Sequence, residues 1–383
     1  MNKNYLPVWQ APEPAPVAAR IAIAGDFLPA GKLVLPPIGS WREQASRLAG
    51  HFEDVDTSLV NLEGCLDAGQ LAPRALIGLG QIVSAPAASL EYLQAVRTRA
   101  VGIANNHSYD FGDQGVAHTK EAIARYGMVP LGAGVSLEER PEIFVWQGPG
   151  SLRVGFWTAA KATSDPATGN RRGVEPATLD RACHALETIR SRGASFCVAL
   201  LHAGCMRANR PDPEDVDLME SLAQSGFDLV AASHSHRIAG YKHLSGFQNR
   251  DAFCFFGLGS IVSGYASSPL EREGLVVVAG LSAEGKLVSL EARSVLIDAT
   301  GFGTTPSLDQ AALILDRLRI LSSELKDGSY ERHFYREVSR GLGRLYLRDA
   351  QAAFRSAGLG GLARKAMRVR MRHVKRLMRK VSG

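Results

Sequence analysis

A short apolar segment that runs into polar residues recurs six times along this chain, and this recurrence constrains the fold more than any other feature. Each segment has the length of a β-strand, and the stretches between several of them repeat apolar residues at three- and four-residue spacing, as amphipathic helices do. Alternating strands and helices are typical of α/β proteins. The six segments are Ile21–Ala24, Asp56–Asn61, Ala100–Ala104, Phe196–Leu201, Asp228–Ala232 and Phe253–Phe256.

Helices and hairpins complete the predicted pattern. The helix-like stretches are Leu90–Arg97, Gly115–Tyr126, Pro176–Arg192 and Pro213–Ser225, followed late in the chain by Leu308–Leu325 and Tyr330–Leu347. Two antiparallel hairpins are predicted, Ile143–Trp146 with Arg153–Thr158 and Gly274–Leu281 with Lys286–Ile297. We therefore expect a loose arm over residues 1–19, a large α/β domain over 20–298, a helical extension over 299–361 and a basic amphipathic tail helix over 362–383.

The net charge of +6 comes from the end of the chain. Residues 362–383 contain nine Lys or Arg and no acid, so the remainder carries 35 basic and 38 acidic residues. A net charge of about −3 on that remainder offers no basic groove, and we expect no nucleic acid as a partner. The tail has a Met and Val stripe beside an Arg and Lys face, which predicts either contact with an anionic membrane or docking of the stripe on the protein.

The location of the protein is predicted from what the sequence lacks. Its first residues form no apolar signal-peptide core, and no run of 18 apolar residues is present. Five cysteines without a CxxC spacing suit a reducing compartment. The sequence therefore predicts a cytoplasmic protein that is able to lie on the inner face of the cell membrane.

Polar side chains gather where the predicted strands end, at the sheet edge where α/β proteins bind ligands. Three imidazoles, two carboxylates and an amide form a mixed nitrogen and oxygen set that suits divalent Zn, Mn or Fe, and two such ions can activate a water between them. Each residue alone is equally compatible with a turn, a helix cap or a hydrogen-bonded rim position. The residues are Asp26, Glu63, Asn106, His202, His234 and His236, with His107 as a spare proton donor.

Ordered motifs then identify a family resemblance that covers about residues 20–280. The sequence resembles the CapA family of capsule-synthesis proteins, a branch of the calcineurin-like metallophosphoesterases. The block from Ala104 to Gly112, which contains Asn-Asn-His-x-x-Asp-x-Gly, is the most specific. The other motifs are Gly25-Asp26, Asn61-Leu62-Glu63-Gly64, His202-Ala203-Gly204, Ser233-His234-Ser235-His236 and Phe256-Gly257-Leu258-Gly259-Ser260.

The resemblance implies a four-layer α/β/β/α sandwich with a crevice for two divalent metal ions. By position, Asp26 and His236 would hold one ion, and Glu63 would bridge it to the other. The second ion would have Asn106, His202 and His234 as ligands. His107 would be the general acid or base, and Asp110 would orient its ring.

Three departures from the family pattern lie near the expected crevice. Leu28 stands where the wider superfamily has a histidine, which predicts a weak or empty metal site. Met206 and Ser260 replace the Glu and Asn that family members often carry, so two polar groups are lost. These changes predict either an altered substrate preference or reduced activity.

Two functions of different classes follow. The first is a metal-dependent hydrolase or transferase that acts in the biosynthesis of capsule or another cell-surface polymer, poly-γ-glutamate or polysaccharide. Its substrate would be an anionic polymer or a phosphate ester, which Arg207 and Arg210 are placed to bind unless they form a solvated surface pair. The second is a non-catalytic assembly or regulatory subunit of a membrane-bound polymer synthase.

Overall fold

The computed structural model describes residues 4–13, 15–33, 39–74, 82–161, 163, 165–247 and 250–339. The chain divides into two units, Met1–Glu331 and Arg332–Gly383. Every element named below belongs to the first unit, and the described residues 332–339 of the second unit are helical.

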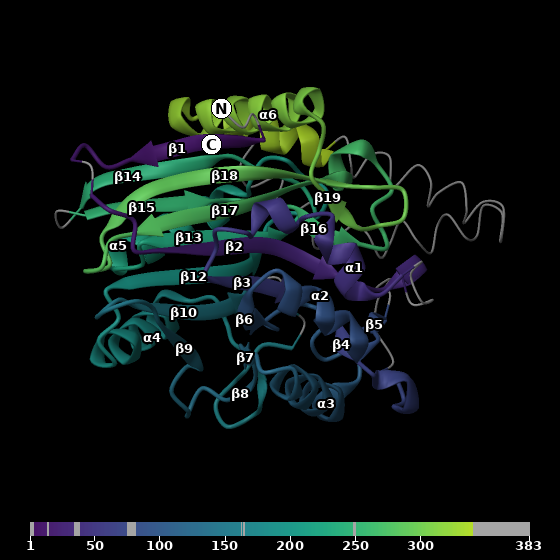
Figure 1. Cartoon of the computed structure of the whole chain (residues 1–383). Coiled ribbons are helices and arrows are strands. Elements are labelled where there is room, and N and C mark those ends of the chain that lie inside the picture. The colour runs from purple at the N-terminus through teal and green to yellow at the C-terminus, as the bar shows by residue number, and fades with distance from the viewer. Residues whose placement is uncertain are drawn as a thin grey trace. The chain divides into compact units, whose positions relative to one another are not determined.

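Two β-sheets form the centre of the first unit (Figure 1). In the first sheet, β2, β3, β6 and β7 run parallel, and β1, β17 and β18 are antiparallel to their neighbours. Its main order is β1 (Tyr5–Gln10), β18 (Leu287–Ile297), β17 (Glu273–Leu281), β2 (Ala19–Leu28), β3 (Thr57–Leu62), β6 (Thr98–Gly102) and β7 (Val129–Leu131). In addition, β16 (Ser260–Ser263) pairs with β2, and β19 (Gly303–Thr304) pairs with β18.

The second sheet has four parallel central strands between two antiparallel edges. Its order is β14 (Tyr241–Phe247), β15 (Arg250–Phe255), β13 (Leu229–His234), β12 (Phe196–Ala203), β10 (Arg153–Ala160) and β9 (Ile143–Gln147). Two small ladders join β4 (Cys65–Leu66) to β5 (Ser84–Ala85) and β8 (Ala133–Val135) to β11 (Gly173–Val174). The predicted strands and both predicted hairpins are confirmed.

Side-chain alternation explains how the sheets stack. Successive residues of a strand point to opposite faces. Ile21 and Ile23 of β2 accordingly lie in the core between the two sheets, whereas Ala22 and Ala24 lie in the core on the other face of the first sheet. Because both faces are buried, the strand reads as a continuous apolar run rather than as an alternating one.

Helices cover the two outer faces. The first sheet is covered by α1 (Trp41–Ser46), α2 (Leu90–Ala95) and α3 (Gly112–Arg125), and the second by α4 (Leu179–Ser191) and α5 (Pro213–Ser225). This order of layers is the predicted four-layer α/β/β/α sandwich. The four helices expected from apolar spacing are therefore confirmed, within a few residues at each end.

One further helix, α6 (Leu308–Asp327), lies across an edge of the sandwich beside β14, β18 and β1 (Figure 1). Ser307 begins it with a capping box to Gln310, and Gly328 ends it at φ 79°. Its residues Ile314 and Leu318 enter the core between the sheets. The predicted helix thus closes a side of the core that would otherwise meet water.

One expectation about the chain ends is revised, and another is not tested. The stretch predicted as a loose arm contains β1, which pairs with β18, and Leu6 in it is buried. Pro7 is accommodated because β1 is an edge strand whose register shifts between Pro7 and Trp9. The tail helix expected over 362–383 lies outside the described residues. Within the described part of the chain, no helix has the length and apolar character needed to cross a membrane.

Candidate metal centre

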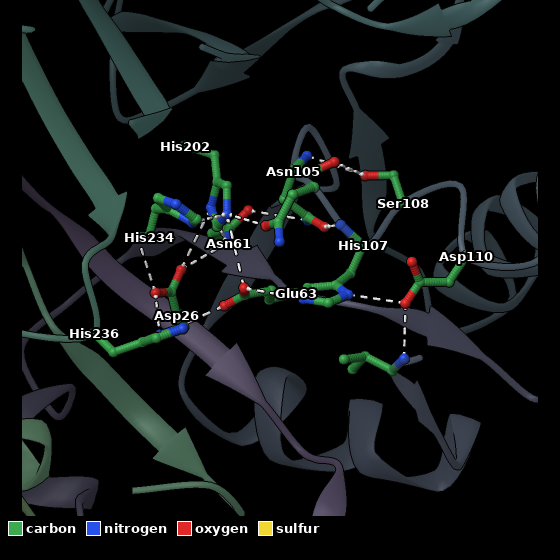
Figure 2. Close-up of polar contacts among 12 residues, drawn as sticks. Asp26, Asn61, Glu63, Asn105, His107, Ser108, Asp110, His202, His234 and His236 are labelled. Carbon is green, nitrogen blue, oxygen red and sulfur yellow. Dashed lines mark hydrogen bonds and ion pairs between the residues drawn. The ribbon is translucent and has the colours of Figure 1, made fainter. Parts of the chain in front are cut away.

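The polar residues predicted to share a sheet edge do meet, although they come from the ends of strands in both sheets rather than in one (Figure 2). Asp26 lies near the end of β2, Glu63 directly follows β3, His202 lies near the end of β12 and His234 ends β13. Both carboxylates and both of these imidazoles are at least 92% buried. Such a concentration of ionisable groups is costly to bury unless partners or a metal compensate it.

Four donor atoms, here called the inner set, converge around His202 Nε2. Asn106 Oδ1 lies 2.7 Å from this nitrogen, His234 Nδ1 lies 2.9 Å from it and Glu63 Oε1 lies 3.7 Å from it. His202 Nδ1 is 3.3 Å from the Asn61 amide, which can donate a hydrogen bond to it. A neutral His202 then carries its one proton on Nε2. This proton can be donated to Asn106 Oδ1 or to His234 Nδ1 but not to both, so one of the two short contacts is left without a hydrogen bond.

Three further donor atoms, here called the outer set, meet on the other side of Glu63. His236 Nδ1 lies 3.1 Å from Asp26 Oδ2 and 3.7 Å from Glu63 Oε2. The side chain of His236 is 19% exposed, so water reaches this set more easily than the inner one. Glu63 places one carboxylate oxygen in each set, and it is therefore the link between them.

The backbone at the end of β13 holds His234 and His236 in an uncommon conformation. If β13 continued beyond His234, strand alternation would put both rings on one face. Instead, β13 ends at His234, which has φ 107°, and His236 lies beyond the strand at φ 54°. Positive φ is uncommon for residues other than glycine and costs free energy, so tertiary contacts hold these rings in place.

His107 stands beside the inner set with its ring held by a carboxylate. Its Nδ1 lies 2.8 Å from Asp110 Oδ2, which also accepts a hydrogen bond of 2.7 Å from the Val83 amide. The other ring nitrogen, Nε2, lies 4.0 Å from Glu63 Oε1 (Figure 2). Asp110 therefore orients the ring so that Nε2 faces the donor sets.

Two asparagines support the cluster, and the sequence interpretation gave neither a role. Asn61 Nδ2 donates a hydrogen bond of 2.7 Å to Asp26 Oδ1. Asn105 Oδ1 accepts the His107 amide at 3.0 Å, and Asn105 Nδ2 donates to the Leu62 carbonyl at 2.7 Å. Both residues stand within the motifs quoted above. A buried amide two residues before Glu63 or His107 was the signal that could have found them.

Burial and neighbouring charges shift the pKa values of the outer set in opposite directions. Burial is the main cause that raises the pKa of Glu63 to about 7, and the charge of Asp26 adds to it. Burial would lower the pKa of His236, but the charge of Glu63 and the hydrogen bond to Asp26 raise it to about 9. Burial would likewise raise the pKa of Asp26, yet His236 and His202 hold it well below its usual range.

The inner histidines behave differently. Burial lowers the pKa of His234 to about 4, and the charge of His236 acts in the same direction. The pKa of His202 is also far below its usual value, because the ring is buried and His234 is close. Both rings are therefore neutral at physiological pH, which is the form that binds a metal.

His107 has a raised pKa. Burial opposes this shift, but the hydrogen bond to Asp110 and the charges of Glu63 and Asp110 outweigh it. A raised pKa favours the protonated ring, which suits a group that delivers a proton.

The arginines predicted to bind substrate lie in ion pairs. Arg210 forms a bidentate pair with Glu324 of α6, with both N–O distances at 2.8 Å. This pair joins the loop after β12 to α6, so the guanidinium of Arg210 is engaged in holding the fold. Arg207 Nε lies 2.8 Å from Glu271 Oε1, and its side chain is 62% exposed. Arg207 is thus the more accessible of the two.

The three departures from the family pattern have distinct surroundings. Leu28 is buried in a small apolar cluster with Ala30, Val83 and Tyr265, so no donor from that position reaches the outer set. Ser260 is fully buried and opposite Asp26 in the β16–β2 pair, and its hydroxyl has no hydrogen-bond partner among the described residues. Met206 is 53% exposed.

The donor atoms fit divalent metal ions. Ligand atoms about 2.0–2.2 Å from one ion lie about 3–4 Å from each other. The distances from His202 Nε2 to the other inner donors and from His236 Nδ1 to the other outer donors are 2.7–3.7 Å. Glu63 Oε2 is buried and accepts no hydrogen bond from any described residue. Mixed imidazole, carboxylate and amide donors suit Zn, Mn or Fe.

Comparison with known families identifies the chain. Residues 20–265 match the family described as bacterial capsule synthesis protein PGA_cap. The chain belongs to this family. The match covers β2 through β16 and contains every residue of both donor sets. The predicted resemblance to CapA proteins is confirmed.

Relatives with assigned names are distant. A probable polyglutamine synthesis accessory protein of Mycobacterium tuberculosis is 25% identical over 325 residues, which cover 82% of this chain and 80% of that protein. The PGA biosynthesis protein CapA of Bacillus subtilis is 24% identical over 177 residues, which cover 45% of each chain.

Two solved structures resemble the chain at low identity. The NAD nucleotidase of Haemophilus influenzae is 12% identical with a TM-score of 0.45, and the match covers 84% of this chain but only 60% of the nucleotidase. A calcineurin-like phosphoesterase of Bacillus subtilis is also 12% identical, with a TM-score of 0.43, and the match covers 80% of this chain and 98% of that protein.

Proposed function

We propose that this chain is a metal-dependent hydrolase or transferase that acts in the biosynthesis of capsule or another cell-surface polymer. The observation that carries the proposal is the convergence of two donor sets on Glu63, with the His107–Asp110 pair beside them. Residues from five separate strand ends meet there, and the cost of burying them is difficult to explain by fold stability alone.

The chemistry divides between the donor sets and His107. Two divalent ions bound in these sets would stabilise a phosphate-like oxyanion and lower the pKa of a water. The chain supplies the geometry, because Glu63 fixes the spacing of the sets and Asn61 holds Asp26. His107 presents Nε2 toward the sets, where it can protonate a leaving group, while Asp110 retains Nδ1.

The substrate class in this proposal is an anionic polymer, poly-γ-glutamate or polysaccharide, or a phosphate ester used in its assembly. The family description and the names of the Mycobacterium and Bacillus relatives support this class. Arg207, at 62% side-chain exposure, is the cation best placed to meet such a substrate. Membrane-bound synthase subunits are the proposed protein partners.

A second candidate is a non-catalytic assembly or regulatory subunit of such a synthase. The exposed Met206 favours it, because this apolar side chain stands four residues after His202, where a family glutamate is often found. An apolar contact surface beside the donor sets would suit a protein partner better than a polar substrate.

The two candidates are separated by metal content and turnover. The protein would be produced with Mn, Zn or Fe supplied in turn, its bound metal measured by elemental analysis, and its turnover tested on phosphate esters and γ-glutamyl polymers. Bound metal with turnover that is lost in Glu63→Gln supports the enzyme. Bound metal with no turnover on any of these substrates favours the assembly subunit, and the absence of bound metal contradicts the proposed centre.

The proposed location is the cytoplasmic face of the cell membrane, and its support is the sequence of residues 362–383 alone. Each basic residue near an anionic surface contributes about 1 kcal/mol to binding. We expect the full chain to sediment with anionic vesicles at low salt, and the chain truncated after Gly361 to stay in the supernatant. If the full chain does not sediment, the tail packs on the rest of the protein or binds a protein partner instead.

A further inference from the structure

A cavity of about 510 Å³ lies at the edge of the first sheet opposite the donor sets. Its lining includes Asp56, which precedes β3, and Arg99 at the start of β6. The donor sets follow the other ends of these parallel strands, so β3 and β6 lie between the cavity and the donor sets. At about 3.3 Å per residue, a strand of this length spans about 20 Å. The cavity is therefore a separate place on the molecule.

Three arginines from different elements line this cavity. Arg42 comes from α1, Arg97 follows the end of α2 and Arg99 belongs to β6. Within the described residues, none of their side chains forms an ion pair or a hydrogen bond. Asp56 is the one acid among the described lining residues, and it accepts a hydrogen bond from the Arg20 amide. The cavity therefore carries an excess of positive charge that the fold does not neutralise.

Arg99 is the extra residue of a β-bulge at the start of β6, because Thr98 pairs with Ser58 and Ala100 with Leu59. A bulge interrupts the alternation of side chains and re-aims the residue that it inserts. The exposed Arg99 lines the cavity together with Arg42 of α1 and Arg97, which follows α2. Arginines from three separate elements therefore share one cavity.

Arg97 occupies a position that glycine usually fills. It follows the C-cap of α2 with φ 61°, in the left-handed region that L-residues rarely adopt. Glycine there would avoid the backbone cost, whereas arginine accepts that cost and directs a guanidinium to the cavity lining. Strained residues cluster at ligand-binding positions, and the φ of Arg97 is therefore one argument for a site here.

We propose that this cavity binds an oxyanion ligand that carries at least two adjacent phosphate or carboxylate groups. A guanidinium group can bind a phosphate or a carboxylate through two parallel hydrogen bonds. Three arginines without ion-pair partners are more than one such group requires, so the ligand is expected to carry two. The volume is that of a small-molecule site. Tyr126, also in the lining, adds a hydroxyl that can donate a hydrogen bond to the ligand. The proposal does not depend on catalysis at the donor sets.

Calorimetric titration tests the site with two probes, inorganic pyrophosphate and a γ-glutamyl trimer. We expect saturable binding of at least one probe to the full chain, weaker at about 200 mM salt than at about 50 mM. Pyrophosphate alone would identify a phosphate ligand, and the trimer alone a carboxylate ligand. The triple variant Arg42→Gln/Arg97→Gln/Arg99→Gln should bind about tenfold more weakly or worse.

Two controls make the test specific. Arg140→Gln/Arg192→Gln/Arg319→Gln removes the same charge from exposed positions elsewhere and should keep the affinity of the wild type. Glu63→Gln disables the donor sets and should also keep it. The proposal is overturned if neither probe binds, if the control triple loses binding equally, or if Glu63→Gln abolishes it, since the anion would then sit at the donor sets.

A single substitution separates binding from folding. Arg97→Gly removes the guanidinium and relieves the positive φ, so the melting temperature should stay equal or rise. The affinity should nevertheless fall by about threefold to fivefold, the value of one accessible ion pair. An unchanged affinity in a folded Arg97→Gly protein would remove Arg97 from the site. It would also show that the positive φ of this residue does not serve ligand binding.

Discussion

The inner and outer donor sets share Glu63 but differ in the number of donor atoms and in their access to water. The inner set gathers four atoms, from Glu63, Asn106, His202 and His234. The outer set gathers three, from Asp26, Glu63 and His236, and the position that could add a fourth is the buried Leu28. A divalent ion bound by three protein donors fills its remaining positions with water or substrate.

This difference predicts that the two sets bind metal with unequal affinity. Both inner histidines have lowered pKa values and are neutral, so no proton competes with a metal at the inner set. His236 has a pKa raised to about 9, and its proton must leave before the ring can bind a metal. The inner set is therefore suited to tight, structural occupancy, and the outer set to weaker and exchangeable occupancy next to substrate.

Removal of the shared carboxylate should have the largest effect. Glu63→Gln takes a charged donor from both sets, and we expect the loss of nearly all bound metal and of all turnover. Loss of a residue that merely supports a ligand costs about 10–100-fold in affinity, so a direct bridging ligand should cost more. Elemental analysis provides the measurement. Glu273→Gln, a buried carboxylate outside both sets, should keep its metal, and equal loss there would show a general folding effect.

His107→Ala should separate chemistry from metal binding. The ring stands beside both sets but belongs to neither, so turnover should fall about 10²–10⁴-fold while metal content and melting temperature stay nearly constant. His118→Ala, an exposed histidine on α3, is the matched control and should keep full activity. Full activity in His107→Ala would remove this residue from the proposed mechanism.

Leu28→His should reduce the difference in the number of donor atoms between the two sets. A histidine at the end of β2 would add a fourth donor to the outer set, and metal content should rise by up to about one ion per chain. Burial of an imidazole among Ala30, Val83 and Tyr265 should cost about 1–3 kcal/mol of stability. Leu28→Met keeps the volume and should leave the metal content as in the wild type. No gain of metal in a folded Leu28→His protein would show that position 28 does not face the outer set.

His51 provides a reference histidine outside both sets. It is buried, its Nε2 lies 2.7 Å from the Ser294 carbonyl, and burial lowers its pKa from 6.5 to about 4. The folded state resists the proton that the unfolded state accepts, so the stability contribution is complete above pH 6.5 and is lost as pH falls toward 4. The shift corresponds to about 3 kcal/mol.

His51→Gln should therefore flatten the fall in stability between pH 6.5 and 4 in urea unfolding of the metal-free protein. His118→Gln serves as the control, because it removes an exposed histidine and leaves His51 in place. If the two variants have the same pH profile, the buried imidazole of His51 does not resist protonation in the folded protein.

Much of the fold and of the site could be predicted because the relevant signals are local. Apolar strands, helical spacing and turn residues are recognised within ten or so neighbouring positions. The structure confirms the strands, both hairpins and the helices predicted before residue 328. The predicted donor residues all meet, because the carboxyl ends of β2, β3 and β6 in the first sheet and those of β12 and β13 in the second lie at the same edge of the sandwich. The family resemblance then indicated which donors would bind the same metal ion.

What escaped prediction depends on partners distant in sequence. Arg210 was assigned to substrate, but Glu324 on α6 takes both ends of its guanidinium, and no local pattern connects positions 114 residues apart. The N-terminal segment was expected to be loose, but the free edge of β18 gave it a partner. Asn61 and Asn105 found their roles only when Asp26 and His107 were brought beside them.

The sequence by itself determined which side chains are able to donate to a metal, on which strand ends they stand, and that position 28 offers no donor. The tertiary structure decided the geometry. It holds His234 and His236 at positive φ, a conformation that their own backbone disfavours and that strand alternation does not predict. It also buries Glu63 between two histidine-bearing loops, and this burial shifts the pKa of Glu63 to about 7. Burial and strain arise only when distant segments pack together, and for that reason the donor residues could be named in advance but their arrangement could not.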